Sequence, residues 1–261
     1  MSRHPERVIS LVPSLTETVL DLGLPPERLV GRTAWCDSPP CVRRVRRVGG
    51  TKTPMIGRIL KLKPDLVLMD AEENRLQDHR SLREAGIEIL LSTTRCVADV
   101  PDLLRALGDR LGLASGVKAA DCLQRALDGL RTPSETSAGP AVLPLIWLDP
   151  LMALGPDRYG GDLLRRAGFR LALPSAATAY PVVNPADPGT PSPDWLLLSS
   201  EPWAFTMHEG RQLQQAFHLA GRHKPRLRRL DGKLLTWFGS RTVEGLAACV
   251  SLRRELQRIQ L

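Results

Sequence analysis

The chain has 261 residues, of which 43% are hydrophobic and 25% are charged, as is ordinary for a globular protein with a buried core. No apolar run approaches membrane-spanning length, and the start lacks the basic and apolar regions of a secretory signal peptide. We therefore expect no membrane insertion and a cytoplasmic location, or a periplasmic one if the true start lies upstream. The formal net charge of +8 favours anionic partners but identifies none.

Strand and helix patterns alternate through the first half of the chain. A buried strand is predicted at 8–12, and Ser14 and Glu17 have the spacing of a capping box that starts a short helix. Continuous apolar strands separated by helices are typical of a parallel sheet covered on both faces. The further predicted strands are 29–31, 66–69 and 87–91, and the further helices are 56–62, 76–85 and 97–111.

Apolar residues recur at every third or fourth position between Ser115 and Arg131, which predicts one amphipathic helix. Similar strands, each entered through Pro-Asp, lie before this helix at 64–68 and after it at 193–197. The economical interpretation is two similar α/β lobes joined by a single helix. One continuous α/β domain with an ordinary surface helix explains the spacing equally well.

The second half continues the alternation with more interruptions. Pro144 lies inside a predicted strand and should place it at a sheet edge or distort it. The region 174–193 is rich in proline and is predicted to be an irregular loop. The predicted strands are 142–148, 195–199 and, more weakly, 227–230 and 234–237, and the predicted helices are 160–167, 207–220 and 242–259.

Several motifs resemble a known family. They are the segment Arg7–Glu17 (RVISLVPSLTE), Cys36–Pro40 (CDSPP), Leu62–Val67 (LKPDLV) and, in the second half, Gly155–Gly161 (GPDRYGG). Together they are similar to the vitamin B12 and iron-siderophore binding proteins of ABC importers, the helical-backbone class of periplasmic binding proteins. The resemblance implies two Rossmann-like lobes with parallel sheets and one long backbone helix, with bounds 1–113, 114–132 and 133–261. It places the ligand in a cleft between the lobes.

The function implied by this resemblance is non-catalytic binding of a cobalamin, another corrinoid or a similar metal chelate, with no cofactor required. Two alternatives stay open. The chain is the substrate-binding subunit of an ABC importer for vitamin B12 or a ferric siderophore, or it is an enzyme or regulator that reuses the fold. A monomer is expected.

Candidate ligand-binding residues follow predicted strands, because ligands of open parallel sheets bind beyond the carboxyl ends of the strands. Aromatic faces pack well on flat macrocycles, although each tryptophan is alternatively a core residue. Glu73 and Asn74 either contact ligand amides or form a solvated turn, and Tyr159 either contacts the ligand or holds its loop. The predicted binding residues are Trp35, Glu73, Asn74, Trp147, Asp149, Tyr159, Trp203 and Trp237.

No direct metal ligands are predicted, because the five histidines show no paired spacing. Basic residues crowd two stretches, 43–47 and 222–229, which suit either a nucleic-acid surface or a solvated one. No nucleic-acid module accompanies them, so we expect a solvated surface and no nucleic-acid partner. In importer-linked relatives a glutamate on each lobe docks onto arginines of the permease. Gly57 stands at the first of these positions, which makes docking onto an ABC permease doubtful.

Overall fold

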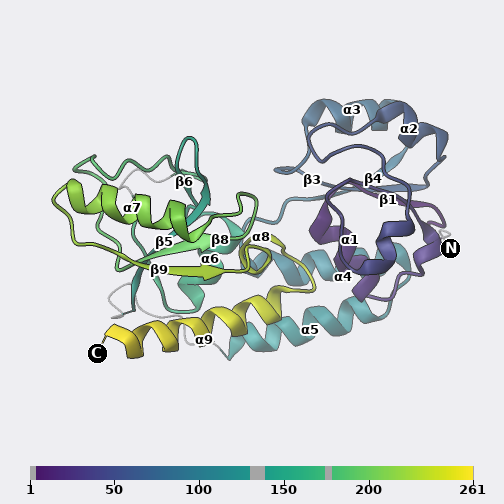
Figure 1. Cartoon of the computed structure of the whole chain (residues 1–261). Coiled ribbons are helices and arrows are strands. Elements are labelled where there is room, and N and C mark those ends of the chain that lie inside the picture. The colour runs from purple at the N-terminus through teal and green to yellow at the C-terminus, as the bar shows by residue number, and fades with distance from the viewer. Residues whose placement is uncertain (1–3, 130–138, 174–177, 261) are drawn as a thin grey trace. The chain divides into compact units, whose positions relative to one another are not determined.

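A computed structural model of the protein describes residues 4–129, 139–173 and 178–260 (Figure 1). The chain divides into two compact units, each built around its own sheet. Unit 1 comprises Met1–Thr94, Ala98–Leu127 and Trp237–Arg241, and unit 2 comprises Arg95–Val97, Asp128–Thr236 and Thr242–Leu261. None of the described helices is both long and apolar enough to span a bilayer.

The sheet of unit 1 is entirely parallel, with the strand order β2-β1-β3-β4. Its strands are β1 (Val8–Ser10), β2 (Leu29–Arg32), β3 (Leu66–Asp70) and β4 (Glu88–Ser92). Helices cover both faces, with α2 and α3 on one and α1 and α4 on the other (Figure 1). Their bounds are α1 (Pro13–Asp21), α2 (Ile56–Lys61), α3 (Leu76–Glu84) and α4 (Val100–Leu111). One core cluster joins Ile9 and Val67 of the sheet to Ile59 of α2 and Leu82 of α3.

The sheet of unit 2 has the order β6-β5-β8-β9, and β7 pairs with the start of β5. Its strands are β5 (Ala141–Trp147), β6 (Met152–Ala153), β7 (Arg170–Leu171), β8 (Trp195–Ser199) and β9 (Arg226–Leu230). The core cluster includes Leu143, Leu196 and Phe217, so α7 packs on this sheet. The helices are α6 (Tyr159–Arg166), α7 (Met207–Leu219), α8 (Lys233–Thr236) and α9 (Thr242–Gln260).

The predicted α/β class with parallel sheets is confirmed, and most predicted elements form within two or three residues of their predicted bounds. The central amphipathic helix is α5 (Ser115–Asp128), and the end of its predicted range lies outside the described residues. Short 3-10 turns add η1 (Pro26–Arg28), η2 (Pro40–Arg44) and η3 (Val97–Asp99).

The predicted capping box at the start of α1 is wrong. The N-cap is Val12, whose carbonyl accepts from Thr16 N at 3.0 Å, and Pro13 begins the helix in the position where proline is pre-organised. Glu17 is instead buried, and its carboxylate accepts hydrogen bonds from Arg241 and from Ser38, the latter at 2.5 Å. The local spacing could not reveal this role, because the arginine that pairs with Glu17 lies 224 residues further along the sequence.

Pro144 does not place β5 at an edge, because β5 pairs with β8 on one side and with β6 and β7 on the other. The carbonyls of Val142 and Pro144 accept from Ala172 N at 2.8 Å and Leu154 N at 2.9 Å. The N–H and C=O of one strand residue point to the same side, so the N–H that Pro144 lacks would face the side of β6 and β7, at the gap between these two strands. The ladder with β8 therefore loses no hydrogen bond.

The weak strand predicted at 234–237 is also wrong, since residues 233–236 form the short helix α8. Asp231 Oδ1 accepts from Lys233 N at 3.0 Å, and Leu235 N donates to Gly232 O at 2.9 Å. An aspartate that bonds the backbone two residues onward starts a turn, and the turn overrides the apolar pattern that follows it.

Candidate functional site

Two tryptophans meet at the carboxyl edge of the unit 2 sheet. Trp147 ends β5, and Trp203 follows β8, the neighbouring parallel strand. Their ring centroids lie 5.4 Å apart with an interplanar angle of 72°, the edge-to-face arrangement that aromatic pairs favour. Trp203 N donates to Ile146 O at 3.2 Å, which fixes the loop after β8 against the end of β5.

Polar partners hold both indoles of this pair. Trp147 Nε1 donates to Asp149 O at 2.9 Å, and Trp203 Nε1 donates to Glu209 Oε1 at 3.3 Å. Trp147 is 37% exposed, whereas Trp203 packs partly against the core. The structure thus brings together three of the predicted binding residues, Trp147, Asp149 and Trp203, in one indole surface with an exposed Asp149 beside it.

At the carboxyl edge of the unit 1 sheet, Trp35 stands in the loop after β2 and is 68% exposed. A Cβ added at Gly50 would lie 3.5 Å from Trp35 Nε1, so the indole edge lies over the backbone of the Gly49–Thr53 loop. Glu73 is exposed in the loop after β3. These two predicted residues can therefore present an aromatic face and a carboxylate to a solute.

Asn74 is different, because its amide is buried and bonded to the loops around it. Its Oδ1 accepts from Asp70 N at 2.9 Å, and its Nδ2 donates to Leu11 O at 3.2 Å and to Thr51 O at 3.0 Å. Asp70 Oδ1 in turn accepts from the backbone N–H groups of Glu72 and Glu73. Burial raises the pKa of the Asp70 carboxyl, against the opposing effect of these hydrogen bonds. Asn74 and Asp70 thus hold the turn that carries Glu73.

Further buried polar groups frame the loop of Trp35. Arg32 is 2% exposed, with Nε donating to Val42 O at 2.6 Å and Nη1 to Thr33 O at 2.9 Å. The Cys36 thiol lies 3.0 Å from Thr16 Oγ1 and 3.1 Å from Thr33 Oγ1, and burial raises its pKa. These residues were not predicted for the site. The signal available for Arg32 and Asp70 was a polar residue at the end of a buried strand.

Tyr159 and Trp237, both predicted to contact ligand, lie in the interior. Tyr159 is 5% exposed, its hydroxyl donates to Thr242 Oγ1 at 3.1 Å, and burial raises its pKa. Trp237 is 6% exposed, and the Arg241 guanidinium carbon lies 5.8 Å from the centroid of its ring. Burial of these side chains favours a structural role within each unit.

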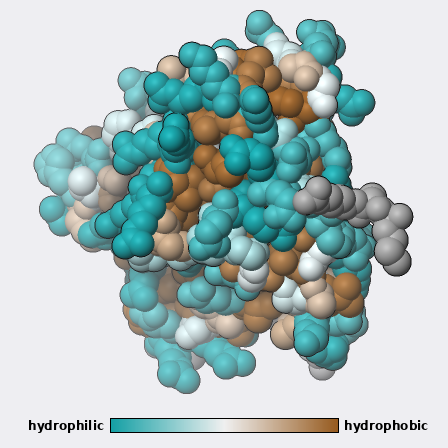
Figure 2. Space-filling model, turned by 90° about the vertical axis from the view of Figure 1, so that its right-hand side faces the viewer, coloured by the Kyte–Doolittle hydropathy of each residue, from teal (hydrophilic) through white to brown (hydrophobic). Residues whose placement is uncertain are grey.

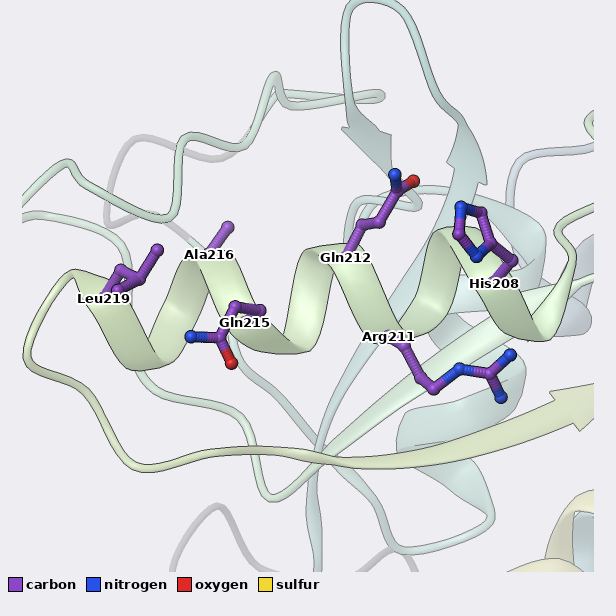
Figure 3. A pocket seen from close by; sticks show the side chains of 6 residues that line it. All are labelled: His208, Arg211, Gln212, Gln215, Ala216 and Leu219. Carbon is purple, nitrogen blue, oxygen red and sulfur yellow. The ribbon is translucent and has the colours of Figure 1, made fainter.

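A shallow hollow of about 450 Å³ runs along α7 and contains none of the predicted binding residues. Figure 3 shows that its lining side chains all come from this one helix and point to different sides of it. They are His208, Arg211, Gln212, Gln215, Ala216 and Leu219. Within the described residues, no three histidine, cysteine or acidic side chains come close enough to hold a metal ion.

The curated relatives of the chain include the vitamin B12-binding protein of Vibrio cholerae, to which it is 28% identical over 180 residues. This match covers 69% of the chain and 65% of the relative, so the chain spans about two thirds of the length of the curated protein that it matches.

Two solved structures have the same fold over nearly the whole chain. The periplasmic vitamin B12 binding protein BtuF of Vibrio cholerae has a TM-score of 0.78 at 23% identity, with 97% of this chain and 98% of that chain covered. A periplasmic heme binding protein from Pseudomonas aeruginosa has a TM-score of 0.78 at 24% identity, with 95% and 92% covered. The predicted cytoplasmic location is contradicted, because the family whose profile matches most of the chain is one of periplasmic binding proteins.

The sequence profile of the family described as "Periplasmic binding protein" matches residues 8–223, which is most of the chain. This match includes the strands of unit 1, the helix α5 and the strands β5 to β8 of unit 2. The motifs that resemble helical-backbone binding proteins lie almost entirely inside it. The chain belongs to the periplasmic binding protein family.

Proposed function

We propose that the protein binds a large metal chelate of the vitamin B12 or haem type and releases it without chemical change. The observation that carries this proposal is the indole pair Trp147 and Trp203 at the strand ends of unit 2. Indole faces offer a broad apolar surface of the kind on which a macrocycle packs. The names of the relatives support the same class of ligand.

Exposed carboxylates favour a corrinoid over haem as the ligand. Asp149 lies beside the indole pair, and Glu73 is exposed in the strand-end loop of unit 1. A corrinoid carries neutral amide side chains, whose N–H groups donate to carboxylates, whereas the propionates of haem are repelled by them. Trp35 in unit 1 exposes a further aromatic side chain.

The test is a titration of tryptophan fluorescence with cyanocobalamin and, separately, with haemin. We expect quenching that saturates, with tighter binding of cyanocobalamin, and about tenfold weaker binding by Trp147→Ala. Trp195→Phe is the matched control, because Trp195 is 5% exposed within β8 and its buried Nε1 has no hydrogen-bond partner within the described part of the chain. Absence of saturable quenching by either compound would refute the proposal. Equal weakening in both variants would remove the indole pair from the site.

Delivery to an ABC importer is a second candidate function, favoured by membership of the family. In importer-linked relatives a glutamate on each lobe docks onto the permease, and Gly57 offers no carboxylate at the first of these positions. Gly57 is exposed on α2, and a Cβ added there would meet nothing within 4 Å, so the fold itself does not require glycine. We propose that Gly57→Glu restores a docking carboxylate. ATPase activity of a reconstituted vitamin B12 importer should be stimulated by the variant more than by the wild type, and strong stimulation by the wild type would contradict this idea.

A further inference from the structure

The entire excess of positive charge lies in one short segment of unit 1. The chain contains 36 lysine and arginine residues and 28 acidic residues. Residues 40–63 hold eight of the basic residues and no acidic residue, so the rest of the chain has 28 of each and no net charge. We call this segment the cationic segment. Its basic residues are Arg43, Arg44, Arg46, Arg47, Lys52, Arg58, Lys61 and Lys63.

All eight basic side chains are exposed. Arg58 Nη1 donates to Arg47 O at 3.2 Å, so α2 and the stretch after η2 adjoin each other in the fold. No ion pair of the described residues joins any of the eight to a carboxylate. Clustered like charges repel one another, and folded proteins usually intersperse both signs. A binding partner with many negative charges would relieve this repulsion.

In the second basic stretch, 222–229, two arginines have structural partners. Arg222 donates to the carbonyls of Pro185, Asp187 and Thr190, and so fastens the 185–190 loop. Arg228 pairs with Glu255 at 2.8 Å. The two basic stretches therefore differ, because the second contains an arginine that fastens a loop and another that pairs with a carboxylate, whereas no ion pair of the described residues involves the cationic segment.

The surface around the cationic segment also exposes apolar groups. Met55 is 47% exposed and Leu60 is 40% exposed, and both lie among the basic residues. Figure 2 views the molecule from the side on which α2 lies in Figure 1, and there hydrophilic residues surround exposed hydrophobic ones. Exposed cations next to apolar side chains suit the interface of an anionic bilayer, where lipid phosphates meet the acyl chains.

We propose that the cationic segment holds unit 1 on the surface of a membrane that contains anionic phospholipids. The attraction is electrostatic, with Met55 and Leu60 in contact with the headgroup region. It adds to the function of the family, since it keeps the binding protein close to a membrane, and it does not depend on the identity of the chelate.

The experiment is co-sedimentation of the full chain with vesicles of about one part phosphatidylglycerol to three parts phosphatidylethanolamine, at about 0.1 M salt. Each cation near an anionic surface strengthens binding by about fivefold. The variant Arg43→Gln/Arg44→Gln/Arg46→Gln/Arg47→Gln should therefore bind at least tenfold more weakly. The matched control Arg211→Gln/Lys224→Gln/Arg229→Gln/Arg258→Gln removes the same charge from exposed positions of unit 2 and should bind within about threefold of wild type.

Three results would overturn the proposal. One is no binding of the wild type to these vesicles above its binding to phosphatidylcholine vesicles. Another is an equal loss in the two quadruple variants, which would assign the effect to total charge. The last is equally tight binding to a DNA duplex under the same conditions, which would indicate a general affinity for polyanions. Thermal melting of each variant checks that it is folded, and a variant that does not fold is replaced by the double variant Arg46→Gln/Arg47→Gln, with about a fivefold or greater loss expected.

Discussion

The carboxyl edges of the two sheets use their side chains in different ways. In unit 1 two polar side chains at this edge, Asn74 and Arg32, are buried and bonded to loop backbone, while Trp35 and Glu73 are exposed. In unit 2 the edge presents the indole pair Trp147 and Trp203. The difference indicates that a buried polar residue after a strand frames a loop, whereas an exposed aromatic residue can contact a ligand. We call a buried residue that holds a loop a frame residue, and an exposed residue that can contact a ligand a contact residue.

Asn74→Ala should have the largest effect and should act on stability. It removes hydrogen bonds to three backbone groups, one of them the buried carbonyl of Leu11, so the free energy of unfolding should fall by about 3 kcal/mol. Urea unfolding measures this change, and Glu73→Ala at the exposed neighbouring position should cost less than about 0.5 kcal/mol. Equal costs at the two positions would break the distinction between frame and contact residues.

Trp203→Leu should mainly weaken binding. Leucine keeps apolar contact with the core under the loop but removes the indole, so cyanocobalamin affinity should fall by about 1.5 kcal/mol, roughly tenfold. Titration calorimetry measures the affinity, and thermal melting reports how much of the loss is structural. An unchanged affinity would show that Trp203 acts as a frame residue and does not contact the ligand.

Trp35→Ala sharpens the comparison within unit 1. Its side chain is 68% exposed, so the free energy of unfolding should change by less than about 0.5 kcal/mol. Affinity for cyanocobalamin should fall by about 1 kcal/mol or more, because the aromatic contact is lost. The idea fails if the variant is as stable as wild type and binds equally well.

Tyr159→Phe should lower the free energy of unfolding by about 0.5–1 kcal/mol, because Thr242 loses its hydrogen-bond donor. Affinity should stay within about twofold of wild type if Tyr159 is a frame residue. A tenfold loss of affinity in a stable variant would instead assign it a contact with ligand, as the sequence predicted.

Asp70 should show the smallest effect, through pH. Burial raises its pKa above the ordinary 3.8, so its contribution to stability is fully present below that value and is lost as pH rises through the raised pKa. Asp70→Asn does not titrate, so its stability relative to wild type should increase from about pH 4 to about pH 7. Urea unfolding at the two pH values checks the sign, and a relative decrease would contradict it.

The strands were predictable because each is a short apolar run bounded by turn residues, as at 66–69 and 195–199. The two-residue strands β6 and β7 were missed because they are formed by pairing with β5 and have no pattern of their own. Aromatic residues at strand ends could be identified from sequence. The contact between Trp147 and Trp203 could not, because periodicity does not reveal that β5 and β8 are neighbours. Burial of Tyr159 and Asn74 likewise depends on partners that are distant in sequence or in other loops.

The return of Trp237–Arg241 to unit 1 has a consequence for the order in which the chain is completed during synthesis. Glu17 is 5% exposed, and its carboxylate is paired with Arg241, which is synthesised 224 residues after it. Until then unit 1 would have to bury a negative charge without its guanidinium, which is strongly unfavourable. Unit 1 therefore begins first but is completed only after most of unit 2 has been synthesised, and a fragment that ends at Leu127 should leave α1 loosely packed.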